Sequence, residues 1–358
     1  LLSRREELGG FLPLRKVSDE KLIPKKESFT DFDKKLDREQ STTMVFVRLL
    51  TKLLRDPSIG SRVVPIVPDE ARTFGMDALF RQFGIYSSEG QKYEPEDADK
   101  VMFYRESESG IMLEEGINEA GAFSAWLALA TSYSNNNLPM IPFYIFYSMF
   151  GFQRIHDLAW AAGDSRAKGF LLGATSGRTT LNGEGLQHQD GHSHILASTI
   201  PNCRSYDPCY SYELAAIIQE GIKDMYEEGN DRYYYITVMN ENYSHPEKPK
   251  QLKNEDILKG AYKYKEHKKA NLRILASGVT LNFALEAEKE LKKYEINTEI
   301  WSITSFNELY REGIETERLN RLNSTSNKSY VQNCFNDEIP TIAVSEYQRA
   351  YPNQIREW

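Results

Sequence analysis

The stretch IPFYIFYSMFGFQR, residues 141–154, decides the fold class. Its first half, Ile141–Tyr147, is a short apolar run rich in aromatic residues, which predicts a buried strand. The second half opens a helix that we predict over Phe150–Ala162. A strand that runs directly into a helix is the repeating unit of a parallel sheet, because parallel strands need a long crossover connection.

The same alternation continues on both sides of this stretch. Upstream, Ser41 or Thr42 caps a predicted helix with a single apolar stripe, and Val63–Val67 is a buried strand. Downstream, Ile111–Tyr133 is mostly helical by its pattern, and Asp207-Pro208 begins another helix. Further strands are predicted at Phe170–Gly173, Leu196–Cys203 and Tyr233–Met239. This order of elements predicts an α/β fold, with a parallel sheet flanked by helices.

A polar, Pro- and Lys-rich stretch at His245–Lys253 predicts a domain boundary. We therefore divide the chain into a linker or arm (residues 1–40), an α/β domain (41–248) and a partial second α/β domain (249–358). In the second domain the predicted strands are Ile274–Ser277, Glu299–Thr304 and Thr341–Val344, the predicted helix is Ala284–Lys293, and Asn320–Asn333 is predicted as loop. The start LLSRREELGG has no initiator Met, so we expect a piece of something longer.

Composition narrows the class of protein. The chain of 358 residues carries 52 acids against 44 bases, a net charge of −8, which disfavours a nucleic-acid partner. The most apolar stretch, residues 138–152, is shorter than the ~20 residues of a membrane-spanning helix, so we expect no membrane association. The three cysteines of the chain form no CxxC pair, which argues against a disulfide framework and fits a reducing cytoplasm.

Glu119 lies in GINEAGA, residues 116–122, where Ala122, Phe123 and Trp126 follow on the same helical face. A carboxyl group on an apolar face is costly without a partner, and burial helps it to hold and share a proton near neutral pH. The alternative is an ordinary surface glutamate at an acidic helix start.

The loop GEGLQHQDGHSH, residues 183–194, carries His188, His192 and His194 in seven residues. Histidine is the side chain best suited to move protons near neutral pH, so we favour proton-handling catalysis. Two alternatives remain, a metal site formed by the three imidazoles and histidines with structural roles.

Two other motifs carry weaker signals. GATSGRTT, residues 173–180, resembles a phosphate loop but is one residue short and has Arg178 in place of Lys, so we interpret it as a turn after a strand. The aromatic run 143–154 is predicted core, with an aromatic wall for a flat heterocycle as its functional alternative. No GxGxxG follows any predicted strand, which leaves a Rossmann dinucleotide site unsupported.

Together, and in this order, these segments resemble one family. The match is carried by PDEARTFGMD (residues 68–77), GINEAGA, and TSGRTTLNGEGLQHQDGHSH (residues 175–194). The chain is similar to homodimeric pyruvate dehydrogenase over roughly residues 40–245, and more weakly beyond them through ASGVTL and WSITSF. Transketolase is a more distant relative with the same domain plan. The resemblance implies a transketolase-like pyrimidine-binding domain for thiamine diphosphate, followed by part of a C-terminal domain.

The resemblance also implies roles for single residues. Glu119 matches the glutamate that hydrogen-bonds the pyrimidine ring of the cofactor, and His188 matches a histidine that positions substrate or moves a proton during acyl transfer. The remaining matches are Ile117, which props the bent cofactor; Phe150, which packs on the pyrimidine; Tyr147 and Glu184, which lie around the substrate; and Asp69 and Glu70, which face the cofactor near a dimer interface.

The implied reaction is oxidative decarboxylation of pyruvate, with transfer of the acetyl unit to a lipoyl group on an acetyltransferase partner. The implied cofactors are thiamine diphosphate and Mg²⁺, and the implied assembly is a homodimer. The family binds the diphosphate and Mg²⁺ through a GDG motif in an earlier domain, and Gly163-Asp164-Ser165 lacks the second glycine. We therefore expect no metal ligand in this chain, half of each active site, and no turnover by the chain alone. The alternatives are a catalytically silent dimerisation fragment and a metal-dependent hydrolase that uses His188, His192 and His194.

Overall fold

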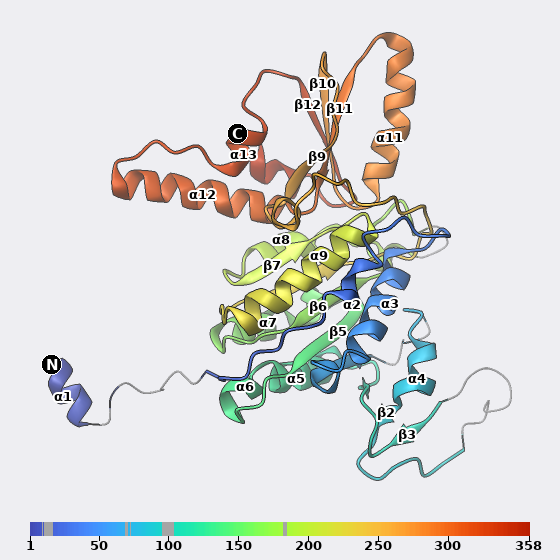
Figure 1. Cartoon of the computed structure of the whole chain (residues 1–358), viewed down its shortest axis with the longest axis vertical. Coiled ribbons are helices and arrows are strands. Elements are labelled where there is room, and N and C mark those ends of the chain that lie inside the picture. Colours follow the sequence, from blue (N-terminus) through green and yellow to red (C-terminus); the bar gives the residue numbers. More distant parts are fainter. Residues whose placement is uncertain (9, 11–16, 69–70, 72, 95–103, 182–184) are drawn as a thin grey trace.

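The computed structural model describes residues 1–8, 10, 17–68, 71, 73–94, 104–181 and 185–358. Within these residues the chain forms two α/β units, with the smaller, C-terminal unit packed on one side of the larger (Figure 1). None of the described helices is both long and apolar enough to cross a lipid bilayer.

The larger unit is built on a six-stranded sheet in the order β4-β1-β5-β6-β8-β7. Every neighbouring pair in it is parallel. The strands are β1 (Val63–Val67), β4 (Leu113–Glu114), β5 (Ile141–Tyr147), β6 (Phe170–Ala174), β7 (Cys203–Tyr206) and β8 (Tyr233–Thr237). The predicted fold class, a parallel sheet with helices on its faces, is therefore confirmed.

Helices cover both faces of this sheet, which explains why its strands are almost continuously apolar. One face packs on α3 (Thr42–Leu54) and α9 (Ser211–Ile222), with the short α2 (Glu27–Thr30) beside them. The other packs on α5 (Glu119–Ala130), α7 (Gly151–Asp164) and α8 (Ser193–Ser198). Alternate residues of each strand therefore enter two separate cores.

Local signals in the sequence fix the ends of the principal helices. The Ser41 hydroxyl accepts the amide of Met44 and caps α3, as predicted. The Asn118 side chain accepts the amide of Gly121 in the same way at α5. The fully buried Trp126 of α5 donates its indole N–H to the carbonyl of Phe170, which fixes α5 to the sheet.

The C-terminal unit has four strands in the order β12-β10-β11-β9. Strand β9 (Ala261–Lys265) is antiparallel to β11 (Thr298–Ile303), whereas β10 (Leu272–Ala276) is parallel to both β11 and β12 (Thr341–Val344). The helices of this unit are α11 (Thr280–Leu291), α12 (Phe306–Asn323) and α13 (Tyr330–Cys334), and α10 (Asn254–Leu258) precedes β9.

Buried polar groups join the two units. The Glu213 carboxylate of α9 accepts hydrogen bonds from the hydroxyls of Tyr262 and Ser302, both in the C-terminal unit. The same carboxylate accepts the amides of Cys209 and Tyr210 at the start of its own helix. Glu213 is fully buried, and this burial raises the pKa of its carboxyl.

A second cluster of the interface surrounds Asp207, directly after β7. Thr237 donates to its Oδ1 at 2.7 Å, and Tyr347 of the C-terminal unit donates to the same atom at 3.3 Å. Burial raises the pKa of Asp207 to about 7. The neighbouring His194 stacks on Tyr351, and burial lowers the pKa of this imidazole to about 4.

Three predicted boundaries are wrong, each because a capping or pairing interaction was not readable from periodicity. Leu196–Cys203 is not a strand, since α8 occupies Ser193–Ser198 and β7 only begins at Cys203. The Asp190 carboxylate accepts the amides of His192 and Ser193 and so begins that helix.

The other two errors have the same origin. The stretch Ile111–Tyr133 is helical only from Glu119, because Leu113–Glu114 pairs with β1 as strand β4. The predicted loop Asn320–Asn333 contains the end of α12 and the start of α13. Ser329 caps α13 through the amide of Gln332.

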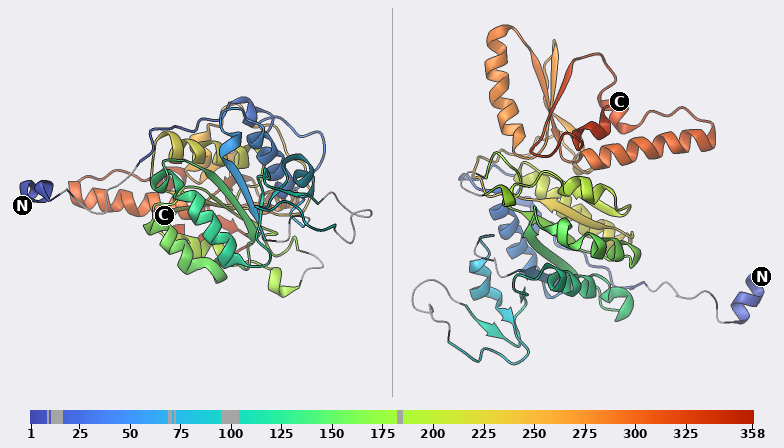
Figure 2. Two further views of the ribbon diagram at one scale, coloured as in Figure 1. Left: turned by 90° about the horizontal axis from the view of Figure 1, so that it is seen from below. Right: turned by 180° about the vertical axis from the view of Figure 1, so that it is seen from behind.

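Two segments extend away from the sheets. The connection from β1 to β4 carries α4 (Asp77–Phe83), β2 (Ile85–Tyr86) and β3 (Glu106–Ser107) outward from the larger unit. The first helix, α1 (Leu2–Glu7), lies on the opposite side (Figure 2).

Candidate functional site

The order of the strands selects one end of the larger sheet. Strand β1 lies between β4 and β5, so the chain leaves β1 toward one side and later returns to its other side. In open parallel sheets, ligands bind at such a reversal, outside the carboxyl ends of the strands. The predicted site residues follow these ends, with Ile117 and Glu119 after β4, and Tyr147 and Phe150 at the end of β5.

Glu119 is the first residue of α5, and its side chain is 14 % exposed. It shares a helix face with Ala122, Phe123 and Trp126, which are buried as predicted. Its Oε1 accepts a hydrogen bond from Arg154 of α7. Gly116, with φ of +65°, turns the chain sharply between β4 and this helix.

Aromatic rings lie beside this ion pair. The Arg154 guanidinium stands 4.5 Å from the centroid of the Phe150 ring. His188 packs against both Phe150, at 5.5 Å between ring centroids, and Tyr147, at 5.0 Å. The structure thus brings together four of the predicted site residues, Glu119, Tyr147, Phe150 and His188, with Arg154 linking the carboxylate to the rings.

Two buried hydroxyls lie on β5 and directly after it. Among the described residues, the hydroxyl groups of Tyr144 and Ser148 on β5 and its end have no hydrogen-bond partner. Burial, followed by the nearby charge of Glu119, raises the pKa of Tyr144. Buried polar atoms without partners cost stability, and they concentrate at sites that bind or react.

Four predicted site residues remain, Ile117, Asp69, Glu70 and Glu184. Ile117 is 70 % exposed at the edge of the site. Asp69 and Glu70, which follow β1, and Glu184, in the His188 loop, lie outside the described residues.

The three histidines of the loop have separate surroundings. His192 contacts Gln153 at 3.1 Å, whereas His194 is fully buried among Tyr235, Tyr347 and Tyr351. His188 lies on the aromatic rings of the site. No group of three His, Cys, Asp or Glu side chains in the described part of the chain is arranged to hold a metal ion.

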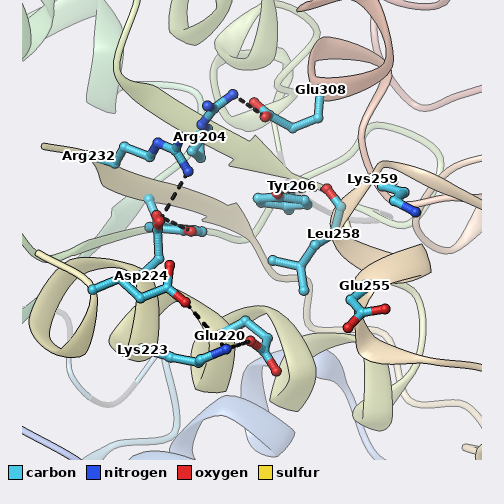
Figure 3. Close-up of a pocket in the computed structure, with 12 residues that line it drawn as sticks. Arg204, Tyr206, Glu220, Lys223, Asp224, Arg232, Glu255, Leu258, Lys259 and Glu308 are labelled. Atoms are coloured by element: carbon cyan, nitrogen blue, oxygen red, sulfur yellow. Dashed lines mark hydrogen bonds and ion pairs between the residues drawn. The ribbon is translucent and has the colours of Figure 1, made fainter. Parts of the chain in front are cut away.

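The hollow shown in Figure 3, about 300 Å³ in volume, is not at this end of the sheet. It lies along the edge strand β7, between α9, α10 and α12. Its charges are largely paired, with Arg204 on Glu308 and Arg232 on Asp224. Mutual pairing of this kind is typical of a structural ion network, and we assign no function to it.

The sequence did not single out Arg154, although this residue lies within the aromatic stretch 141–154. It stands four residues after Phe150, so both side chains project from one face of α7. That spacing was readable. Its contact with Glu119, 35 residues earlier, depends on the packing of α5 against α7 and could not be predicted from the sequence.

Comparison with known proteins identifies the family of the chain. Residues 25–246 match the family described as pyruvate dehydrogenase E1 component middle domain, and residues 260–357 match the transketolase-like C-terminal domain. Two similar proteins are the pyruvate dehydrogenase E1 components of Pseudomonas aeruginosa, 57 % identical over 100 % of this chain, and Escherichia coli, 51 % identical over 99 %. The chain spans 42 % and 41 % of the lengths of these two relatives.

Solved structures show the same fold at low sequence identity. Transketolase from Leishmania mexicana superposes with a TM-score of 0.67 at 15 % identity, over 91 % of this chain and 41 % of its own. A split-gene transketolase, described as an inactive beta4 tetramer, has a TM-score of 0.54 at 16 % identity and is covered over 92 % of its length. From its middle and C-terminal domains and its close relatives, the chain belongs to the pyruvate dehydrogenase E1 component family.

Proposed function

We propose that this chain forms the pyrimidine side of a thiamine diphosphate site that decarboxylates pyruvate and passes the acetyl unit to a lipoyl group. The observation that carries the proposal is the convergence of Glu119, Phe150, Tyr147 and His188 at the carboxyl ends of β4 and β5. They come from separate parts of the chain, and their chemistry suits a flat, nitrogen-containing ring.

The residues present fit such a cofactor. Glu119 offers a carboxylate at the rim of an apolar wall, Phe150 offers an aromatic face, and the buried hydroxyls of Tyr144 and Ser148 offer polar contacts. When bound, thiamine diphosphate supplies a carbon nucleophile and an electron sink for the loss of carbon dioxide.

Each side chain has a distinct task in this proposal. Arg154 holds Oε1 of Glu119, and we assign Oε2 to the ring nitrogen of the pyrimidine, where the carboxylate orients the ring and shares a proton. Phe150 would pack on the ring, and Ile117 would support the cofactor, as the resemblance implies. His188 moves a proton to or from the substrate oxygen, and the ring of Tyr147 fixes its orientation. Asp69, Glu70 and Glu184 keep the roles that the resemblance implies.

We further propose that a diphosphate-side domain, from this or another polypeptide, supplies the Mg²⁺ ligands and the second wall of the site. The exposed position of Ile117 and the partly exposed Arg154, 47 % exposed, are consistent with a surface that another domain covers. The proposed assembly is a homodimer that works with a lipoyl-bearing acetyltransferase. We place it in the cytoplasm, since the cysteines, two of them buried, are free thiols.

The decisive experiment is a calorimetric titration with thiamine diphosphate and Mg²⁺, made on the chain alone and on the chain mixed with a diphosphate-side domain from a relative. We expect binding only in the mixture. Pyruvate decarboxylation should likewise appear only in the mixture. Turnover by the chain alone would refute the half-site.

Glu119→Gln is the informative variant, because it keeps the size of the side chain and removes the charge. We expect at least ~10-fold weaker cofactor binding. The matched control is Glu290→Gln, an exposed glutamate of α11 in an ion pair with Lys293, which should bind as the wild type does. No binding by any mixture would favour the alternative of a catalytically silent dimerisation fragment.

The metal-dependent hydrolase has little support. His188, His192 and His194 have separate contacts, and His194 is enclosed by three tyrosines. Elemental analysis of purified protein tests this alternative, which requires one zinc per chain and its loss in His192→Ala.

A further inference from the structure

A short segment after β12, residues 346–348, reaches back from the C-terminal unit to the larger one. Its residue Glu346 is 5 % exposed. The Glu346 carboxylate accepts the backbone amides of Arg178, at 2.5 Å, and Thr179, at 2.7 Å. It also accepts the hydroxyl of Thr179. One turn of the chain therefore directs three donors at one carboxylate.

That turn belongs to GATSGRTT, which resembles a phosphate loop in sequence. Gly177 adopts φ of +94°, and a Cβ atom there would come within 3.2 Å of the Glu346 carboxylate. Successive amides in such a turn form a concave site for an anion. The anion held by this loop is the side chain of Glu346.

The same segment fastens a second stretch. The amide of Gln348 donates to the carbonyl of Gly191 at 2.8 Å. Arg178 lies against Gly191 as well, since a Cβ atom on that glycine would come within 2.6 Å of its guanidinium. Tyr347, which lies between Glu346 and Gln348 in the chain, packs edge-on against His194, with 4.7 Å between the ring centroids.

Glu346 and Gln348 thus hold the chain on both sides of His188. The anchored positions, Arg178–Thr179 and Gly191, precede and follow the described turn Leu186–His188 that rests on Tyr147 and Phe150. We infer that Glu346 is a positioning residue, which sets the location of His188 without touching substrate or cofactor. This inference rests on the role of His188 in the proposed function.

The test compares Glu346→Gln, Glu346→Asp and the control Glu338→Gln, an exposed glutamate of the same unit. Gln keeps the size of the side chain but has one acceptor oxygen in place of two. In wild type both oxygens of Glu346 accept hydrogen bonds. Asp keeps the charge on a shorter stem. Amide hydrogen exchange is measured by mass spectrometry on peptides covering residues 174–181 and 185–192, and on peptides from β10 and β11.

We expect Glu346→Gln to speed exchange in residues 185–192 by at least ~10-fold, because amides exchange through local opening. Exchange in β10 and β11 should stay at the wild-type rate. In the mixture with the diphosphate-side domain, kcat should fall ~10- to 100-fold with unchanged cofactor affinity, since a displacement of about 1 Å has effects of that size. Glu346→Asp should recover part of both effects, and Glu338→Gln should show neither.

Unchanged exchange in residues 185–192 of Glu346→Gln would overturn the inference. Equal acceleration in β10 and β11 would also overturn it, because it would show a general loss of stability. The exchange measurement needs neither cofactor nor turnover. A wild-type mixture without decarboxylation would therefore contradict the proposed function separately, and exchange would still decide whether Glu346 fixes this stretch.

Discussion

The interface between the two units and the candidate site both contain glutamate and hydroxyl side chains, but these groups differ in burial and in hydrogen bonding. At the interface, Glu213 is fully buried and accepts four hydrogen bonds. At the site, Glu119 shares one oxygen with the partly exposed Arg154, and the nearby hydroxyls of Tyr144 and Ser148 have no partner among the described residues. A satisfied carboxylate stabilises one geometry, whereas groups left open at the ends of strands remain available to a ligand.

The largest expected effect is at the interface. Glu213→Ala leaves four buried donors without their acceptor, so the free energy of unfolding should fall by at least ~3 kcal/mol. Glu220→Ala, two turns later on the same helix, removes a partly buried hydrogen bond from Asn254 at 3.3 Å and a weak contact with Lys223 at 4.0 Å. It should cost under ~1 kcal/mol. Urea unfolding measures the free energy of unfolding of both variants. Equal losses would show that the interface gains nothing from its buried carboxylate.

Asp207→Asn tests the interface through pH. The pKa of Asp207 is raised from 3.8 to about 7, so the folded chain binds a proton there that the unfolded chain has lost. The contribution of this group is present at low pH and disappears as pH rises through about 7. Between pH 5 and pH 8, wild type should lose about 2 to 3 kcal/mol relative to Asp207→Asn.

The pKa shift of His194 changes stability with pH in the opposite direction to that of Asp207, so the two groups can be told apart. Its pKa is lowered from 6.5 to about 4, so the unfolded chain binds the proton first, and stability is lost as pH falls below about 6.5. Asp207→Asn should expose this acid-side loss more clearly than wild type. The control is Asp157→Asn, which replaces an exposed carboxyl outside the Asp207 cluster. A constant difference for Asp207→Asn would mean that Asp207 is ionised throughout.

Smaller effects on stability are expected at the site. Arg154→Ala should change the free energy of unfolding by less than ~1 kcal/mol, because the pair is partly exposed to solvent. Its effect should appear instead as weaker cofactor binding in the mixture, measured by calorimetry. Arg154→Lys keeps the charge but loses the planar contact with Phe150, and should restore binding only in part. A loss of stability as large as that of Glu213→Ala would remove the contrast between the two regions.

The smallest change in stability is expected at Ile117. Since its side chain is 70 % exposed, Ile117→Ser should leave the unfolding curve of the chain unchanged. If a second domain covers it, the same variant should weaken binding of that domain or of the cofactor. Binding equal to that of wild type in the mixture would show that Ile117 stays exposed to solvent.

Much of the fold was predictable because its strands are short, apolar and separated by helices. Strands β1 and β5 have the predicted bounds, and the cap at Ser41 lies where its residue type indicated. The errors fell on β4, on α8, and on the end of α12 and the start of α13. A two-residue strand has no periodicity, and its identity comes only from pairing with β1.

The site was predictable as a set of residues and not as a set of contacts. The residues came from the ordered motifs of the resemblance, and Glu119 also from its neighbours on a helix face. The link from Glu119 to Arg154 and the hold of Glu346 on Thr179 join residues 35 and 167 positions apart. Such pairs depend on tertiary packing, which a single sequence does not encode in any local pattern.

The arm before α3 has a consequence for synthesis on the ribosome. The amide of Leu36 donates to the carbonyl of His245, and Gln40 bridges Tyr243, so the arm is held by residues about 200 positions later. Strand β8 also enters the sheet between β6 and β7, although it follows both in the chain. A nascent chain therefore cannot close this domain until about residue 248 has emerged, and until then the apolar side chains of the arm and the edge of β6 remain open to chaperones and to wrong partners.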